Sequence, residues 1–222
     1  MKNTILYTTV LIAMSLAGCA KNGPQTARPN PSEFETVKDP PIATNTYFAA
    51  GQLAESRQQY DKAEVDYRRA LRDNPNHKDA LYRLGCMLAM EKKYPQAIIV
   101  WKQYVKATDS SAEAYSNLAY CEELAGNPAA AEADYRRGIT ADSKNEACRV
   151  NFGLMLARHN RVNEGVLQLQ AVLSPAEVHY DLAGIYELQR RPELAKAEYQ
   201  AALELDPEMT EAKAKLAQLE NE

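Results

Sequence analysis

The sequence predicts an all-α protein made of five repeated units and one terminal helix. The main observation is a recurring order of small and large apolar residues, which starts anew at Thr44, Lys78, Ala112, Glu146 and Ala176. The starts are spaced by 34, 34, 34 and 30 residues, and a fixed period of about 20 to 50 residues is typical of solenoids. Only nine of the 222 residues are glycine, 45% are hydrophobic and 25% are charged, which suits a soluble helical protein.

Each unit contains residues that resemble the tetratricopeptide repeat, whose pattern is W-x2-L-G-x2-Y, then A-x3-F, then P. The first unit has Tyr47, Ala50-Gly51, Ala63-x3-Tyr67 and Pro75 at these sites. The later units match at Leu84-Gly85 with Ala97-x3-Trp101, Leu118-Ala119 with Ala131-x3-Tyr135, Phe152-Gly153 with Gly165-x3-Leu169, and Leu182-Ala183 with Ala195-x3-Tyr199. The resemblance implies a right-handed superhelix of five helix pairs, with repeats at 44–77, 78–111, 112–145, 146–175 and 176–209.

The matching residues have packing roles in such a repeat. Small residues at positions 8 and 20 let the two helices of a pair approach closely, and large residues at positions 4, 7, 11 and 24 fill the remaining space. Pro95, Pro128 and Pro192 stand where the second helices begin, a position that proline favours. The fourth repeat is four residues short, so we expect its second helix to end about one turn early, ahead of Ser174-Pro175.

Residues 210–222 are expected to form a capping helix after Pro207. Ala212, Leu216 and Leu219 recur at helical spacing and the residues between them are mostly polar. A solenoid needs a terminal element with a polar outer face, and this segment supplies one.

Residues 1–18 have the organisation of a lipoprotein signal peptide. Ile5 to Ala17 is an almost unbroken apolar run, which is shorter than the roughly 20 residues of a membrane span and typical of a signal-peptide core. Leu16-Ala17-Gly18-Cys19 resembles the lipobox of bacterial lipoproteins at all four positions. The resemblance implies that Cys19 is lipidated and becomes the first residue, and two or more acyl chains anchor a protein stably. An ordinary secretory signal is the alternative.

Residues 19–43 are predicted to be a disordered tether behind the lipidated cysteine. Five of the eleven prolines lie here, and such a polar segment cannot bury enough apolar surface to offset its ordering entropy. Ala20 follows Cys19 where retention in the inner membrane typically requires aspartate. The resemblance therefore favours an outer-membrane anchor facing the periplasm.

The partner-binding surface is predicted on the first helix of each pair, because positions 2, 5, 9, 12 and 13 line the concave groove of tetratricopeptide solenoids. Nine apolar or aromatic residues stand at such sites, where they should face solvent: Phe48, Tyr82, Met90, Tyr120, Leu124, Val150, Leu154, Tyr180 and Leu188. Seven carboxylates accompany them: Glu55, Asp79, Glu113, Glu123, Glu177, Glu187 and, from the cap, Glu211. An apolar groove with acidic flanks suits a basic or amphipathic helix or peptide. The alternative is that the tether or a neighbouring helix covers these side chains.

Other function classes lack their sequence signals. The net charge of −4 argues against nucleic-acid binding, which needs a dense basic surface. The four cysteines and three histidines show no metal-ligand spacing, so no metal or cofactor is expected. Neither a glycine-rich phosphate loop nor a nucleophile motif is present, and we do not predict an enzyme. Cys121 and Cys148 fall at buried positions, while Cys86 falls on the groove.

Together these features predict a membrane-anchored protein–protein interaction scaffold of the bacterial cell envelope that assists the assembly of a pilus- or secretion-type complex. The architecture is similar to that of the tetratricopeptide lipoproteins of pilus assembly, both the pilotins of type IV pili and the Tad-type lipoproteins. Two alternatives remain. One is an adaptor or regulator of an envelope enzyme such as a peptidoglycan hydrolase, and the other is an accessory lipoprotein of outer-membrane barrel assembly.

Overall fold

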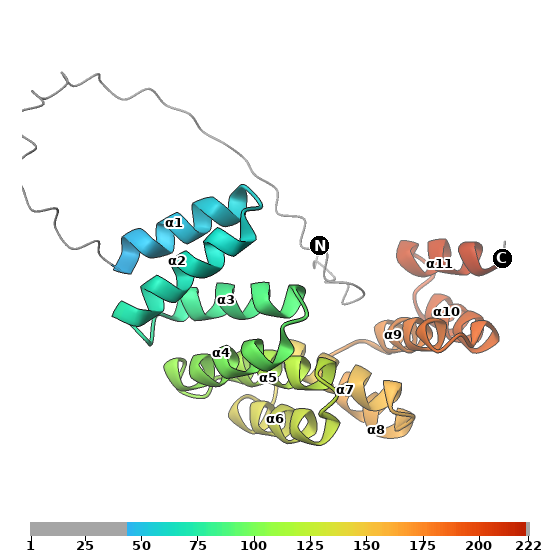
Figure 1. Ribbon diagram of the computed structural model, residues 1–222. Helices are drawn as coiled ribbons and strands as arrows, with labels where there is room; N and C mark the ends of the chain where they lie inside the picture. The colour runs from blue at the N-terminus through green and yellow to red at the C-terminus, as the bar shows by residue number, and fades with distance from the viewer. Residues whose placement is uncertain (1–43, 221–222) are drawn as a thin grey trace, which may run out of the picture. The chain divides into compact units, whose positions relative to one another are not determined.

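The computed structural model describes residues 44–220, and every regular element in this range is a helix (Figure 1). The predicted all-α fold of five helix pairs and a terminal helix is confirmed. The predicted signal peptide and tether lie outside the described residues. The helices are α1 (Thr44–Ser56), α2 (Tyr60–Asp73), α3 (Lys78–Met90), α4 (Tyr94–Ala107), α5 (Ala112–Leu124), α6 (Pro128–Ala141), α7 (Glu146–Arg158), α8 (Val162–Leu169), α9 (Pro175–Leu188), α10 (Pro192–Leu205) and α11 (Thr210–Glu220).

The helices pack mainly against their neighbours in sequence. We call α1, α3, α5, α7 and α9 the A helices and α2, α4, α6, α8 and α10 the B helices, and we count positions within a repeat from residues 44, 78, 112, 146 and 176. Each A helix packs most extensively against the B helix of its own repeat. The B helices α2, α4 and α6 then contact the A helix that follows, and α10 contacts α11. Stability is therefore distributed over nearest-neighbour interfaces, as in other repeat proteins.

Local chemistry sets both ends of the A helices. His77, Ser111, Asn145 and Ser174 precede α3, α5, α7 and α9, and each side chain accepts a hydrogen bond from a first-turn backbone N–H. Such caps satisfy backbone donors that have no partner within the helix. At the other end, position 15 of every repeat has a positive φ, which turns the chain into the B helix. These residues are Gln58, Lys92, Gly126, Asn160 and Arg190, with φ between 56° and 80°.

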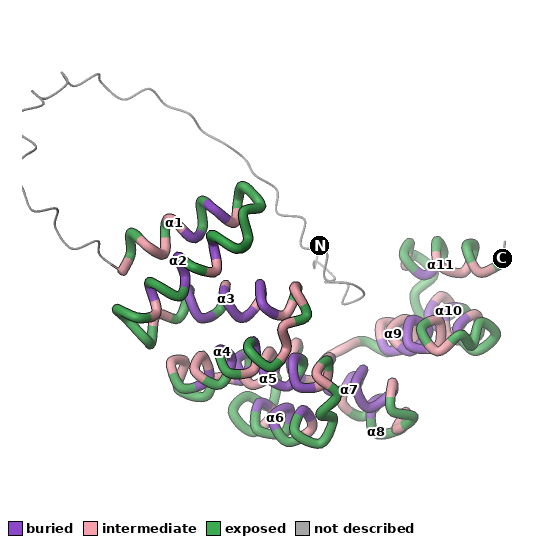
Figure 2. The backbone as a smooth tube through the Cα atoms, viewed as in Figure 1, coloured by how far each residue is buried: buried purple, intermediate pink, exposed green. Residues whose placement is uncertain are grey.

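Within a pair, a small residue on the A helix faces a large one on the B helix. A β-carbon added to Gly51 would lie 2.6 Å from the ring of Tyr67, and one added to Gly85 would lie 2.6 Å from the ring of Trp101. Both rings are almost completely buried, and Figure 2 shows buried segments in every pair. Each ring therefore occupies the space that the missing side chain leaves, as the repeat pattern predicts.

The fourth repeat departs from this arrangement. Helix α8 has 8 residues, whereas the other B helices have 14, so its predicted early end is confirmed. Unlike the longer B helices, α8 makes little contact with the A helix that follows it. Helices α7 and α8 approach at two glycines, since a β-carbon on Gly165 would lie 2.6 Å from the carbonyl oxygen of Gly153. Because glycine has no side chain, the two backbones approach more closely here than larger residues would allow.

The terminal helix α11 covers the last pair. Ala212 is fully buried against Tyr199 and Ala202, and Leu216 and Leu219 are partly buried in the same cluster. The remaining residues of α11 are mostly exposed, as a cap requires.

Candidate partner-binding surface

We call the surface formed by positions 2, 5, 9, 12 and 13 of the A helices the A-helix face. Five of the nine apolar residues predicted there are exposed by 37 to 69%: Tyr82, Met90, Tyr120, Leu124 and Leu188. Phe48 and Tyr180 are half-buried, because each ring packs on the buried tyrosine of its own pair, Tyr67 at 5.8 Å and Tyr199 at 5.5 Å between centroids. The exposed side chains lie on α3, α5 and α9.

The expectation that Val150 and Leu154 face solvent is wrong. They are 3% and 6% exposed and pack in one cluster with Val178, Leu182 and Ile185 of α9. The short α8 provides no long B helix for α9 to rest on, and α9 packs on α7. Coverage by a neighbouring helix, which was the alternative for the whole groove, thus occurs at the fourth repeat.

Three of the predicted acidic groove residues form ion pairs between repeats. Each glutamate occupies position 12 of an odd-numbered repeat, and the cation comes from the next unit of the chain. The pairs are Glu55–Arg83 at 3.2 Å, Glu123–Arg158 at 2.9 Å and Glu187–Lys215 at 3.0 Å. These carboxylates hold neighbouring repeats together, which corrects the expectation of a free acidic flank.

A fourth carboxylate is also engaged within the chain. Glu177 accepts a hydrogen bond of 2.8 Å from the backbone N–H of Ser174 and completes the capping box of α9. Asp79 and Glu113 differ, because both are exposed and neither has a hydrogen bond or ion pair within residues 44–220. On the A-helix face of the second and third repeats, the carboxylates without a partner in residues 44–220 are therefore those at position 2.

An aromatic group lies beside these two carboxylates. The rings of Tyr82, Trp101 and Tyr104 contact one another, with centroids 5.5 to 5.8 Å apart. Trp101 is 3% exposed, Tyr104 is half-buried and Tyr82 is exposed. Trp101 therefore forms the base of the group, and the two tyrosines form its accessible part.

Tyr104 was not among the predicted site residues. It occupies position 27, where repeats 1, 3 and 5 have Ala70, Gly138 and Ala202. At Gly138 a β-carbon would lie 2.7 Å from the sulfur of Cys148, so this position offers little room between helices. A large side chain here must turn towards the surface, and the break in the small-residue pattern was the signal that could have identified it.

The tyrosines and the nearby thiol stay uncharged at neutral pH. The pKa of Tyr82 is raised to about 12, first by Cys86 and by burial and then by Glu113. Burial raises the pKa of Cys86 to about 11. The pKa of Tyr104 is raised by burial and, after that, by Glu113 and Asp79. The negative charge beside the rings is therefore that of the two carboxylates.

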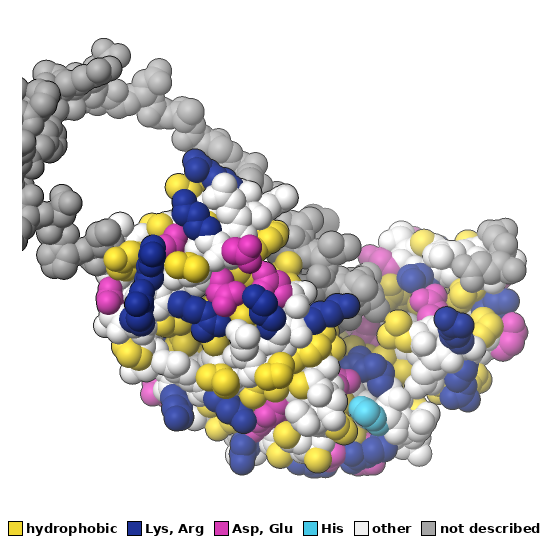
Figure 3. Space-filling view, in the orientation of Figure 1, with side chains coloured by type: hydrophobic (Ala, Val, Ile, Leu, Met, Phe, Trp, Pro, Cys, Tyr) yellow, Lys and Arg dark blue, Asp and Glu magenta, His cyan; other side chains and the backbone are white. Residues whose placement is uncertain are grey.

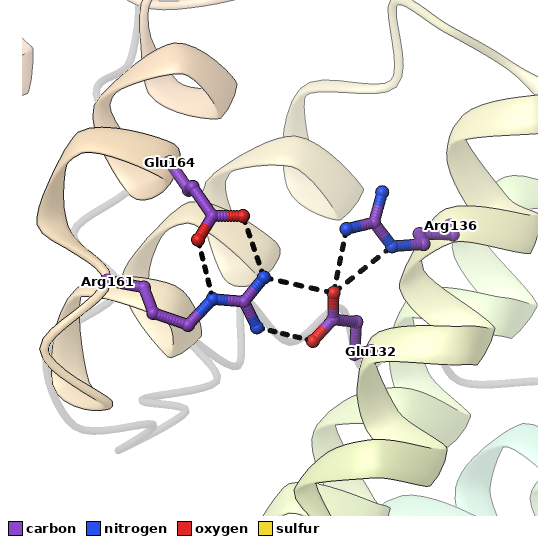
Figure 4. Close-up of polar contacts among 4 residues, drawn as sticks. All are labelled: Glu132, Arg136, Arg161 and Glu164. Atoms are coloured by element: carbon purple, nitrogen blue, oxygen red, sulfur yellow. Dashed lines mark hydrogen bonds and ion pairs between the residues drawn. The ribbon is translucent and has the colours of Figure 1, made fainter.

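A second set of ion pairs joins the B helices. Glu132 of α6 accepts hydrogen bonds from Arg136 on the same helix at 2.7 Å and from Arg161, next to α8, at 2.5 Å (Figure 4). These bonds hold the pKa of Glu132 at about 2. The same two positions of repeats 1 and 2 carry Glu64 and Lys93, 3.0 Å apart. Both contacts connect a B helix to the following repeat.

Charges on the outer surface are mixed. On the face drawn in Figure 3, hydrophobic, acidic and basic side chains are interspersed. Within residues 44–220, no three His, Cys, Asp or Glu side chains are grouped so that they could hold a metal ion. The same part of the chain has no helix of the length and hydropathy that a membrane span needs. Cys19, the predicted lipidation site, lies outside the described residues.

Comparison with known proteins gives partial matches in sequence. The chain is 23% identical over 174 residues to anaphase-promoting complex subunit 3 of Schizosaccharomyces pombe, covering 77% of this chain and 26% of that protein. It is 27% identical over 135 residues to the type IV pilus assembly protein PilF of Pseudomonas aeruginosa, covering 58% of this chain and 54% of that one. The chain thus spans about a quarter and about half the length of these relatives.

Solved structures show the same fold at low sequence identity. The crystal structure of MamA has a TM-score of 0.61 at 20% identity, covering 76% of this chain and 94% of that one. YrrB, described as a tetratricopeptide repeat protein with an unusual peptide-binding site, has a TM-score of 0.55 at 20% identity, with 78% and 92% covered. Pseudomonas aeruginosa PilF has a TM-score of 0.55 at 14% identity, with 80% and 83% covered.

Two models of the tetratricopeptide repeat match the sequence. One matches residues 48–111 and 93–146 and the other matches residues 176–209, which together make up more than half of the chain. The matched residues include the small and large residues that pack the first, second, third and fifth helix pairs in the structure. The chain therefore belongs to the tetratricopeptide repeat family of protein–protein interaction scaffolds.

Proposed function

We propose that this chain is a lipid-anchored scaffold of the bacterial cell envelope that binds a partner protein on its A-helix face and assists the assembly of a pilus- or secretion-type complex. The observation that carries the proposal is the exposure of Tyr82, Met90, Tyr120 and Leu124 on the adjacent repeats of α3 and α5. Grouped large apolar side chains at a surface mark interaction sites. Tyrosine is also common at binding hot spots, since it combines a large apolar body with a polar tip.

The cellular role rests on other observations. The similarity to PilF, a protein named for type IV pilus assembly, supports the pilus-type complex. The peptide-binding site for which YrrB is described supports a peptide or helix as the bound element. The anchor rests on the lipobox resemblance of Leu16-Ala17-Gly18-Cys19, and the outer membrane facing the periplasm is the location it favours.

The binding proposal is tested on Tyr82 and Tyr120. A partner is first identified by pull-down from membranes with the full chain and is then titrated with wild type and with the Tyr82→Ala/Tyr120→Ala variant. We expect unchanged helicity and a loss of about 2 kcal/mol in binding free energy, the usual size of a hot spot. Tyr60→Ala is the matched control, because Tyr60 is 41% exposed on α2, away from the A-helix face. Unchanged affinity in a folded double variant would mean that the partner binds elsewhere on the chain.

The anchor is tested separately at Cys19. Cys19→Ser removes the thiol that the acyl chains require, so we expect loss of labelling by a clickable palmitate analogue and loss of the protein from the membrane fraction. A wild-type chain that takes up no label in a bacterial host would contradict the anchor. That result would leave the binding surface unaffected, because the two parts of the proposal rest on different residues.

A further inference from the structure

We propose that the A-helix face contains a recognition site for a lysine or arginine side chain, formed by the rings of Tyr82 and Tyr104 and flanked by Asp79 and Glu113. The inference rests on the proposed function, since the cation belongs to the partner protein. It restricts the partner contact to one place at the boundary of repeats 2 and 3. It also specifies the chemistry of one side chain that the partner must supply.

The aromatic part of the site is suited to a cation. The centroids of Tyr82 and Tyr104 lie 5.8 Å apart with their planes inclined by 56°, and Trp101 packs edge-on behind both at 5.7 and 5.5 Å. The face of an aromatic ring attracts a cation through its quadrupole, and the alkyl stem of lysine or arginine packs on apolar surface. Trp101 is buried, so it supports the two more accessible rings from inside the protein.

The acidic part of the site lacks a counter-ion within the described chain. Asp79 and Glu113 make no ion pair in residues 44–220, whereas Arg83, which is on the same helix as Tyr82, is held by Glu55 at 3.2 Å. Both free carboxylates act on the Tyr104 hydroxyl, whose pKa they raise in addition to the effect of burial. A cation from outside would therefore meet two unsatisfied charges and no competing lysine or arginine ion-paired to them.

The combination is specific to the second repeat. Repeats 1, 3 and 5 have alanine or glycine at position 27, where repeat 2 has Tyr104. Repeat 3 has Ser116 at position 5, where repeat 2 has Tyr82, and Ser116 is buried and bonded to Asn151. A single site of this kind would fix the register of an elongated partner on the A-helix face.

The experiment uses the full chain and random 12-residue peptides. Binders are selected from a display library, and one is synthesised with its basic residue intact and with that residue replaced by glutamine. The chain has one tryptophan, Trp101, which packs on both tyrosines, so tryptophan fluorescence reports on occupation of the site. We expect selected peptides to be enriched in lysine or arginine.

Variants of the site then test the assignment. Tyr104→Ala should weaken the intact peptide at least tenfold, and Tyr104→Phe should keep its affinity within about twofold, because the ring remains. The Asp79→Asn/Glu113→Gln variant should remove most of the salt dependence of binding. Replacing the basic residue of the peptide should weaken binding less in Tyr104→Ala than in wild type, since part of the same interaction is already lost. Tyr60→Ala is the control for loss of an exposed tyrosine.

The Tyr104→Ala variant is expected to fold, because Ala70 and Ala202 already occupy the same position of two other repeats. The proposed site would be wrong if the selected peptides lacked basic residues. It would also be wrong if folded Tyr104→Ala bound the peptide with unchanged affinity. If binding is then lost in Tyr82→Ala/Tyr120→Ala, partner binding on the A-helix face is supported, while the site for a basic side chain is rejected. Peptide binding that responds to none of these substitutions, or a selection that yields no binder, would count against both.

Discussion

The ion pairs around Glu132 give the most direct quantitative prediction. Glu132→Gln keeps the shape of the side chain but removes the charge that binds Arg136 and Arg161. We expect the variant to unfold at a lower temperature, because Arg161 connects the B helix of repeat 3 to the start of α8. The loss should shrink at high salt, which screens partly exposed pairs.

The magnitude follows from the pKa of Glu132. The hydrogen bonds of Arg161 and Arg136 lower it from 4.5 to about 2, which corresponds to about 3 kcal/mol at roughly 1.4 kcal/mol per unit. The side chains of Arg136 and Arg161 are 59% and 37% exposed, so solvent screening reduces the expected loss to about 1 kcal/mol. For a domain of this size, that loss lowers the melting temperature by about 2 to 4 °C.

The pH dependence has a defined sign. Because the pKa of Glu132 is lower in the folded chain than in the unfolded one, its contribution is present above about pH 4.5 and is lost as the pH falls towards 2. Thermal unfolding followed by far-UV circular dichroism at neutral and acidic pH measures both effects. Glu204→Gln is the control, since Glu204 is exposed on α10 and has no ion pair in residues 44–220. Equal melting temperatures of wild type and Glu132→Gln at neutral pH and low salt would refute the reasoning.

Three further predictions follow from packing and burial. Gly165→Ala should destabilise the fold by about 1 to 3 kcal/mol, the usual cost of overpacking, because its β-carbon would lie 2.6 Å from the carbonyl oxygen of Gly153; chemical denaturation measures it. Burial raises the pKa of Asp181 to about 7, so stability should fall as the pH rises from about 4 to 7, and Asp181→Asn should be more stable than wild type at pH 8 by about 2 to 4 kcal/mol. Deleting 210–222 should expose Tyr199 and promote association, detected by light scattering, because solenoids need their caps.

Each of these has a contrary outcome. A Gly165→Ala variant as stable as wild type would mean that α7 and α8 separate without loss. An Asp181→Asn variant whose stability varies with pH as in wild type would show that this carboxyl is ionised in the folded chain at low pH. A truncated chain that stays monomeric and melts at the same temperature would contradict the role of α11.

The fold could be predicted because the residues that define each helix pair lie close together in the sequence. A small residue at position 8 or 20 and a large one at position 24 fix how each helix pair closes, and the structure places Gly85 against Trp101 and Gly51 against Tyr67 as this pattern requires. The contacts lie within one repeat, so the sequence of that repeat is sufficient. The early end of α8 was visible for the same reason, since it depends on a local loss of residues.

The surface was harder to predict because it depends on contacts between repeats. Val150 is at a groove position, but it is buried because α9 packs on α7. Glu55 is also at a groove position, and it is bound by Arg83, which lies 28 residues later. Whether a residue faces solvent or the next repeat is decided by the relative placement of two repeats, and a pattern within one repeat does not contain that information.

The ion pairs between repeats also show which carboxylates are left without a cation. Pairs on both the A and the B helices connect repeats 1 and 2 and also repeats 3 and 4. Between repeats 2 and 3, the ion pair in the described chain is Lys102–Glu122, at the longer distance of 3.7 Å. The free carboxylates Asp79 and Glu113 flank that same boundary. Charged groups that are not used to hold repeats together remain available to an external cation, so Asp79 and Glu113 are suited to bind a basic side chain of a partner.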